Sequence, residues 1–129
     1  MDLLYHTTDP AKIEPDSFER DELGRLGMPK EIVMRHRTTQ FGHIFSGEGY
    51  AAAYYGYMWA EVLTSDAAEA FAEAPGGFYD KEVGDRLVKY LFSVRNAMDP
   101  EEAYRKFRGR DAKVEALMRD RGFPVTSND

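Results

Sequence analysis

The strongest structural signal in this chain is the stretch YAAAYYGYMWAEVLTSDAAEAFAEA, residues 50–74. It carries nine alanines and no proline, and alanine has the highest helix propensity of all residues. The stretch therefore predicts one long helix over residues 50–74, which Pro75 ends. Within that helix Tyr50, Tyr54 and Tyr57 recur at helical spacing, so they are expected on one face.

Capping residues on both sides of this stretch predict further helices. Asp16 is expected to cap a helix with Glu19 at the reciprocal capping-box position, and Gly27 is expected to end it. Later helices are expected to begin at Asp80, at Asp99 and near Asp111. The sequence has no alternating strand pattern of useful length, so the predicted fold class is all-α and multi-helical.

The composition limits the possible partners and compartments. A chain of 129 residues with 43% apolar side chains is long enough for a single domain, residues 1–129, around one core. The net charge is −6 and the basic residues are interspersed with acidic ones, which argues against nucleic acids and anionic membranes as partners. There is no cysteine, so disulfides and thiolate metal sites are excluded. Because no basic leader and no run of about 18 apolar residues occurs, a cytoplasmic protein is expected.

The segment before the long helix, residues 38–49, is predicted to be a pliable loop. It contains Gly42, Gly47 and Gly49 and shows no helical periodicity. A loop of this length in a small domain is usually functional or disordered. His43 lies in the loop and the tyrosines begin directly after it, so their hydroxyls are expected to face what the loop encloses.

Each of these residues also has a purely structural explanation. A tyrosine often serves as an amphipathic core residue whose hydroxyl reaches solvent or a carbonyl. A single histidine between two phenylalanines, as His43 is, more often packs than catalyses. The three histidines His6, His36 and His43 could together form a zinc site, although their spacing matches no metal motif. The glycines do not form a phosphate-binding motif, because no GxxxxGK[ST] pattern surrounds them.

Three segments together resemble a known enzyme family. They are FGHIFSGEGYAAAYYGYMWAEVL at 41–63, GMPKEIVMRHR at 27–37 and DPEEAYRKFRGRDAKVEALMRDRGF at 99–123. The chain, over about residues 1–123, resembles the C-terminal end of the thimet oligopeptidase, oligopeptidase A and bacterial peptidyl-dipeptidase family of zinc metallopeptidases. The resemblance implies a predominantly helical, clamshell-shaped enzyme with a deep channel between two lobes.

The resemblance assigns the zinc to residues outside this sequence. Family members hold zinc with an HExxH helix and a downstream glutamate, and this sequence has no HExxH motif. What the resemblance places here is the substrate side. It implies that Tyr57 donates its hydroxyl to the oxyanion of the tetrahedral intermediate and that His43 hydrogen-bonds substrate or intermediate. Tyr50 would hold the peptide backbone, and Gly47 and Gly49 would let the loop close over it. The resemblance carries only weak substrate-contact roles for Arg35, Arg37 and Glu48.

Two functional hypotheses follow for the chain. In the first, it is the C-terminal part of a zinc peptidyl-dipeptidase or oligopeptidase, inactive alone, whose partners are a peptide substrate and an upstream zinc-binding lobe. In the alternative, it is a stand-alone, non-catalytic helical domain that binds peptides or a protein. The isolated chain is also expected to self-associate as a symmetric dimer, because surface meant for burial would be exposed.

Overall fold

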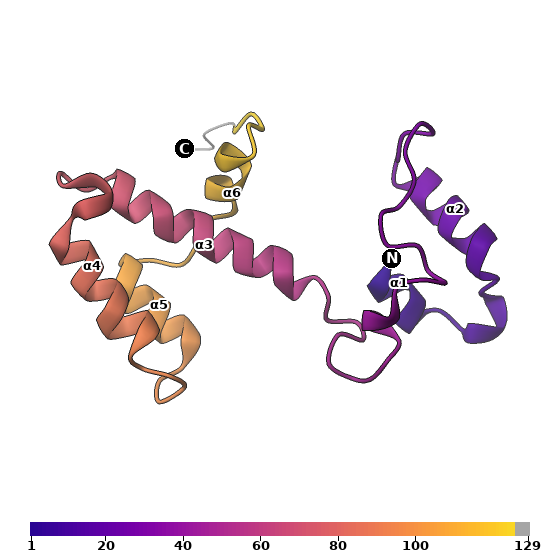
Figure 1. Cartoon of the computed structure of the whole chain (residues 1–129), viewed down its shortest axis with the longest axis horizontal. Helices are drawn as coiled ribbons and strands as arrows, with labels where there is room; N and C mark the ends of the chain where they lie inside the picture. Colours follow the sequence, from indigo (N-terminus) through magenta and orange to yellow (C-terminus); the bar gives the residue numbers. More distant parts are fainter. Residues whose placement is uncertain (126–129) are drawn as a thin grey trace. The chain divides into compact units, whose positions relative to one another are not determined.

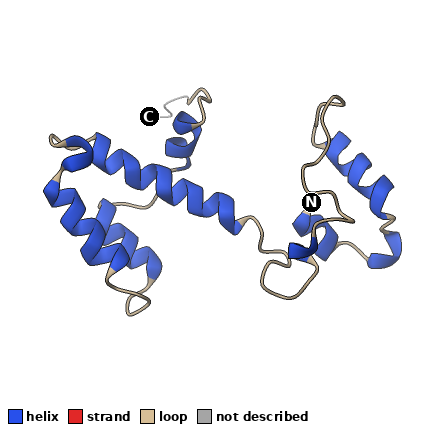
Figure 2. Ribbon diagram, in the orientation of Figure 1, coloured by secondary structure: helices blue, strands red, loops and turns tan. Residues whose placement is uncertain are grey.

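The computed structural model describes residues 1–125, and every regular element in that range is a helix (Figures 1 and 2). The all-α prediction is therefore confirmed. The α-helices are α1 (Asp2–Thr7), α2 (Pro15–Arg25), α3 (Gly56–Ala72), α4 (Lys81–Leu87), α5 (Pro100–Arg108) and α6 (Val114–Asp120). Short 3₁₀ turns span Pro10–Lys12, Gly42–Ile44 and Gly77–Tyr79, and a π-helical turn, Val88–Phe92, continues α4. The chain divides into two compact units, Met1–Gly56 and a second that begins at Tyr57.

In the first unit, the buried side chain of Tyr5 joins α1 to α2 and to the loop that follows α2. The Tyr5 ring lies 5.1 Å from the Phe18 ring of α2 and 5.8 Å from the Phe45 ring, measured between centroids. Its hydroxyl is hydrogen-bonded to the hydroxyl of Thr38. Aromatic pairs at these separations stabilise packing beyond the contribution of the area they bury. Tyr5 therefore holds α1 against α2 and against the loop that follows α2.

The buried carboxylate of Glu19 anchors the start of the loop. It accepts hydrogen bonds from the Thr38 backbone N–H at 2.9 Å, the Thr38 hydroxyl at 2.7 Å and Nε of Arg37 at 3.1 Å. The predicted capping box is wrong, because Glu14 and not Asp16 caps α2, accepting from the N–H of Ser17 at 2.8 Å. Pro15 takes the first helical position, which moves the cap one residue upstream of the proline.

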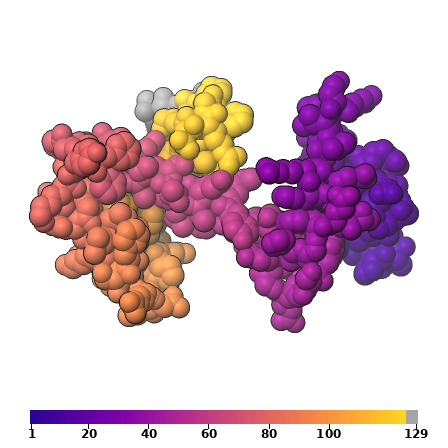
Figure 3. All heavy atoms as spheres, viewed as in Figure 1, coloured from indigo at the N-terminus to yellow at the C-terminus, as the bar shows by residue number. Residues whose placement is uncertain are grey.

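The second unit packs α4 and α5 against α3 around an apolar core. Figure 3 shows the three helices as one continuous mass of atoms. The buried core residues are Ala70 of α3, Val83 of α4, and Tyr104 and Phe107 of α5. The predicted caps are confirmed here: Asp80 accepts from the N–H of Val83, and Asp99 caps α5.

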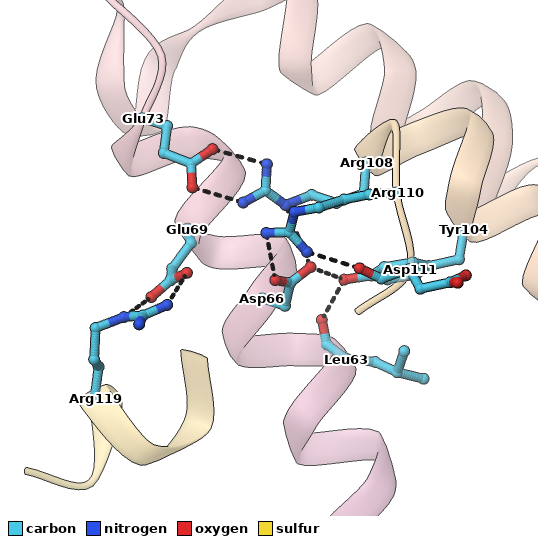
Figure 4. Close-up of polar contacts among 9 residues, drawn as sticks. All are labelled: Leu63, Asp66, Glu69, Glu73, Tyr104, Arg108, Arg110, Asp111 and Arg119. Atoms are coloured by element: carbon cyan, nitrogen blue, oxygen red, sulfur yellow. Dashed lines mark hydrogen bonds and ion pairs between the residues drawn. The ribbon is translucent and has the colours of Figure 1, made fainter. Parts of the chain in front are cut away.

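A buried polar cluster also joins these helices (Figure 4). Asp66 of α3 is fully buried and accepts a hydrogen bond from the Tyr104 hydroxyl at 2.7 Å. Its carboxylate also pairs with Arg108 at 3.3 Å and Arg110 at 2.8 Å. A carboxylate removed from water needs such partners, so Asp66 ties α5 and the segment after it to α3.

The long helix is shorter than its sequence predicts. It begins at Gly56, and residues 50–55 form turns in the first unit. Ala52 adopts a left-handed conformation with φ of 57°. The carboxylate of Asp2 accepts hydrogen bonds from the N–H groups of Ala52 and Tyr54, both at 2.9 Å, so a tertiary contact overrides the local helix propensity. The prediction that Tyr50, Tyr54 and Tyr57 share a helix face is therefore wrong.

Candidate functional site

An open pocket of about 420 Å³ lies within the first unit, where the glycine-rich loop turns back toward Tyr50. Its lining consists of Gly42, His43, Ser46, Gly47, Gly49 and Tyr50. Four residues singled out by the sequence, His43, Gly47, Gly49 and Tyr50, therefore line one cavity. The imidazole of His43 and the ring of Tyr50 lie with centroids 5.7 Å apart.

The Phe41 ring stacks against the His43 ring. It stacks on His43 with centroids 5.1 Å apart and planes inclined by 16°, and on His36 at 4.4 Å and 14°. Phe41 thus stacks with two imidazoles. Offset stacking of this kind favours one ring orientation over others, so the stack limits the directions in which His43 presents its nitrogens.

Tyr54 closes this aromatic group at right angles to the stack. Its ring meets Phe41 edge-on at 5.0 Å, Tyr50 at 5.7 Å and His43 at 6.3 Å. Tyr54 thereby connects the two rings that face the pocket.

The loop backbone shapes the rest of the cavity. The N–H groups of Phe45 and Ser46 both donate to the carbonyl of Gly42, at 3.0 and 2.8 Å, and close a tight turn around His43. A Cβ placed on Gly47 or Gly49 would meet no atom within 4 Å. The two glycines therefore leave the pocket rim open, and space alone does not require glycine at either position.

Tyr57 falls in a different unit from the pocket. It is the second residue of α3 and belongs to the second unit, and it is not part of the pocket lining. Its side chain is half exposed, at 53%. The structure thus brings His43 and Tyr50 together within the first unit, and it assigns Tyr57 to the second unit.

Of the weaker contact candidates, Arg37 has a structural role. It pairs with Glu19 at 3.1 Å and with Asp16 at 3.4 Å. Burial by itself raises the pKa of Glu19, but the hydrogen bonds from Thr38 and the Arg37 guanidinium outweigh it and hold that pKa below its ordinary value. Arg37 therefore serves to neutralise a buried carboxylate, while Glu48 and Arg35 remain exposed.

The sequence interpretation missed the supporting residues of the site. Asp2 lies in the first turn of α1, where an acid looks like an ordinary helix-stabilising residue. Its carboxylate instead binds backbone groups that lie 50 and 52 residues away in sequence. Phe41 likewise carried no signal beyond its hydrophobicity. Such partnerships depend on tertiary structure, so periodicity and capping rules do not reveal them.

The described residues do not fit a zinc ion. Within residues 1–125, no group of three or more histidine, aspartate or glutamate side chains lies where it could hold a metal. The hypothesis of a site built from His6, His36 and His43 therefore finds no support in the structure. The rings of His36 and His43 both stack with the Phe41 ring, and Nδ1 of His6 lies 2.9 Å from a carboxylate oxygen of Asp2.

None of the helices in residues 1–125 has the length and apolar character that crossing a membrane requires.

Curated relatives of this chain are peptidases. Oligopeptidase A of Haemophilus influenzae is 33% identical over 121 residues, which are 92% of this chain and 17% of the relative. Dipeptidyl carboxypeptidase of Escherichia coli is 34% identical over 128 residues, 97% of this chain and 18% of the relative. A probable cytosolic oligopeptidase A of Arabidopsis thaliana is 42% identical over 91 residues, 67% of this chain and 13% of the relative.

The chain thus spans less than a fifth of the length of these relatives. The model of peptidase family M3 matches residues 1–123, which is nearly the whole chain. The resemblance seen in the sequence segments around His43 and Tyr50 is confirmed by this match. The chain belongs to peptidase family M3.

Proposed function

We propose that this chain supplies the peptide-binding side of a zinc-dependent peptidyl-dipeptidase or oligopeptidase, as one C-terminal helical domain of a larger enzyme. The observation that carries the proposal is the pocket in which His43 and Tyr50 lie with ring centroids 5.7 Å apart. The zinc ligands and the HExxH glutamate belong to an upstream lobe outside this sequence. The chain alone is inactive, and the complete enzyme works in the cytoplasm.

The chemistry of the pocket suits a peptide backbone. An imidazole offers one donor and one acceptor when neutral, and a phenol offers a donor that stays protonated at neutral pH. Together His43 and Tyr50 match the alternating N–H and C=O groups of an extended peptide. The open rim at Gly47 and Gly49 leaves space for the chain to enter, and loop closure over it would exclude water.

Tyr57 has a different role in the proposal. Its hydroxyl donates to the oxyanion that forms when the scissile carbonyl becomes tetrahedral. A fixed neutral donor of this kind is worth about 2.7–4 kcal/mol of barrier, judged from other oxyanion donors. Tyr57 is the second residue of α3, so the helix fixes the backbone from which its side chain extends.

Two measurements on the full chain test the proposal. In the first, a short unlabelled peptide is titrated into isotopically labelled chain, and resonances of His43 and Tyr50 are followed by NMR. We expect these resonances to move, and we expect the variants His43→Gln and Tyr50→Phe to weaken binding. The matched control is Tyr79→Phe, because Tyr79 is 96% exposed in the second unit. An unchanged pocket spectrum at saturating peptide would overturn the binding role.

The second measurement is cleavage of an internally quenched peptide, with the chain alone and after addition of the zinc-binding remainder of a family M3 relative. We expect no cleavage by the chain alone and chelator-sensitive cleavage by the mixture. Chelator-sensitive cleavage by the chain alone would contradict the division between lobes. Peptide binding without restored cleavage would favour the alternative, a stand-alone peptide-binding domain.

A further inference from the structure

The carboxylate of Asp2 is hydrogen-bonded to the turn that carries Tyr50 and Tyr54. Its two oxygens accept hydrogen bonds from the N–H groups of Ala52 and Tyr54, each at 2.9 Å. We propose that Asp2 is a positioning residue that fixes the Tyr50 ring against the His43 ring through this turn. We call the two hydrogen bonds from Ala52 and Tyr54 to Asp2 the clamp. The effect of the clamp on peptide binding rests on the function proposed above, whereas the clamp as a structural feature does not.

The clamped turn has a conformation that its own sequence does not favour. Ala52 has φ of 57°, in the left-handed region that residues with a Cβ rarely adopt. The surrounding alanines favour a helix instead. A conformation of this kind persists only where neighbouring groups hold it, and Asp2 supplies acceptors to the turn on both sides of Ala53.

Asp2 is itself held firmly. Its side chain is only 13% exposed, and Nδ1 of His6, one helical turn later, lies 2.9 Å from its carboxylate. Tyr5, between these two residues, is buried against Phe18 and Phe45. Asp2 thus projects from a helix that is packed in place, and its hydrogen bonds are largely shielded from water.

The clamp reaches the pocket through Tyr54. Asp2 does not line the pocket, but it binds the backbone of Tyr54, whose ring contacts both Tyr50 and His43. If residues 50–55 were released into a helix, Tyr50 and Tyr54 would move together onto one helix face, and the turn that now sets their positions relative to His43 would be lost. The contact between Tyr50 and His43 therefore depends on an acid about fifty residues upstream.

A simpler role for Asp2 would be to stabilise α1 through its helix dipole. An acid in the first turn has that effect whatever its side chain contacts. In this structure both oxygens instead bind backbone N–H groups outside α1. Asp9 offers a comparison within the same unit, because its carboxylate caps the local turn at Ala11 at 3.0 Å and Asp9 does not line the pocket.

The test uses NMR on the full chain and begins with the wild type. The amide protons of Ala52 and Tyr54 should exchange with solvent at least tenfold more slowly than in an unstructured peptide. Nuclear Overhauser contacts should connect the rings of Tyr50 and His43. Unprotected amides or missing ring contacts in the wild type would overturn the proposal without any variant.

The variants then separate positioning from folding. Asp2→Asn replaces one acceptor by a donor and should speed exchange of both amides at least tenfold and weaken the ring contacts. Adding Ala52→Gly should partly restore the ring contacts, because glycine adopts the left-handed conformation without strain. Asp9→Asn, the matched control, should leave the amides and the rings unchanged. Intact ring contacts in Asp2→Asn, or equal loss in Asp9→Asn, would refute the clamp.

Measuring the peptide affinity of the same proteins distinguishes a failure of the clamp from a failure of the proposed peptide-binding function. If the wild type binds peptide and Asp2→Asn binds it equally well with intact rings, the clamp fails and the peptide-binding role stands. If the wild type binds no peptide while the amides and rings behave as expected, the clamp stands and the binding role fails. We expect a loss of at least fivefold in peptide affinity for Asp2→Asn and partial recovery with Ala52→Gly.

Discussion

The hydroxyl of Tyr104 donates a 2.7 Å hydrogen bond to the fully buried carboxylate of Asp66, and so joins α5 to α3 (Figure 4). Burial and the neighbouring carboxylate raise the pKa of Tyr104, so the phenol stays a donor throughout the accessible pH range. Arg108 and Arg110 pair with the same carboxylate. A buried polar cluster therefore joins α3 and α5 beside their apolar core.

Asp66→Asn should destabilise the second unit strongly. Breaking a buried ion pair costs about 3–5 kcal/mol, and we expect the lower end because Arg108 keeps its pairing with Glu73 at 2.7 Å. Urea unfolding followed by far-ultraviolet circular dichroism measures the change. Asp85→Asn is the control, since its pair with Lys81 is exposed and should contribute under about 1 kcal/mol. An equal loss of unfolding free energy in the two variants would show that the buried cluster contributes no more to stability than an exposed ion pair.

Stability should also fall in acid through Asp66. Burial raises its pKa, but hydrogen bonds and ion pairs from Arg110, Tyr104 and Arg108 outweigh it and hold the pKa below 3.8, the ordinary value. A pKa depressed in the folded state contributes stability above the unfolded value, and the contribution is lost as pH falls through the folded value. The urea midpoint should therefore drop from about pH 4 downward, less steeply in Asp66→Asn. Parallel curves for both proteins would contradict this assignment.

Local signals predicted the helix ends well. Asp80 and Asp99 cap α4 and α5 as their spacing indicates, and Gly27 and Gly109 adopt the left-handed conformation just after their helices. Each of these features depends on residues within one turn of the cap. The cap predicted at Asp16 is wrong because of the neighbouring Pro15, which is also a local cause, and the helix expected to begin near Asp111 begins at Val114.

The errors arose where distant residues decide the structure. The alanines at 51–53 favour a helix, yet Asp2 holds them in turns. Glu19 looked like a capping residue, yet it is buried against Thr38. The sequence predicted that the tyrosine hydroxyls face what the loop around His43 encloses, and Tyr50 and His43 do line one pocket, although the expected helical face does not exist. The catalytic and binding roles of these residues stay predictions.

Self-association is expected from an apolar pocket within the second unit. The pocket has a volume of about 900 Å³, and its lining includes the exposed side chains of Trp59, Phe78 and Phe92. Exposed apolar patches of this kind drive association, and a second copy of the chain offers the same surface in a symmetric dimer. Sedimentation at tens of micromolar should show a dimer that Phe92→Lys weakens. Phe123→Lys, at an exposed residue outside the pocket, should not, and a monomeric wild type would refute the expectation.

Replacing Phe41 should release the two imidazoles that stack with it. In Phe41→Leu the ring-current shifts that Phe41 causes on His36 and His43 should disappear, because a leucine has no aromatic ring to stack on them, while Tyr50 and Tyr54 still contribute to the shift of His43. Aromatic pairs contribute about 0.5–1.5 kcal/mol beyond buried area, so the first unit should lose stability of that order. Proton NMR and urea unfolding measure the two effects. The control is Phe78→Leu in the second unit, which should leave the chemical shifts of both histidines unchanged. Unchanged histidine shifts in Phe41→Leu would mean that the aromatic stack does not persist in solution.

Tyr57→Phe tests the oxyanion role in the complete enzyme. Removing a donor that acts only in the transition state should lower kcat by about a hundredfold or more, with little change in KM. The variant keeps the ring, so packing at the start of α3 is preserved. Tyr79→Phe removes a hydroxyl from an exposed residue of the same unit and should leave kcat unaltered. A near-normal kcat for Tyr57→Phe would exclude Tyr57 from transition-state stabilisation, whereas a raised KM at constant kcat would assign it to substrate binding alone.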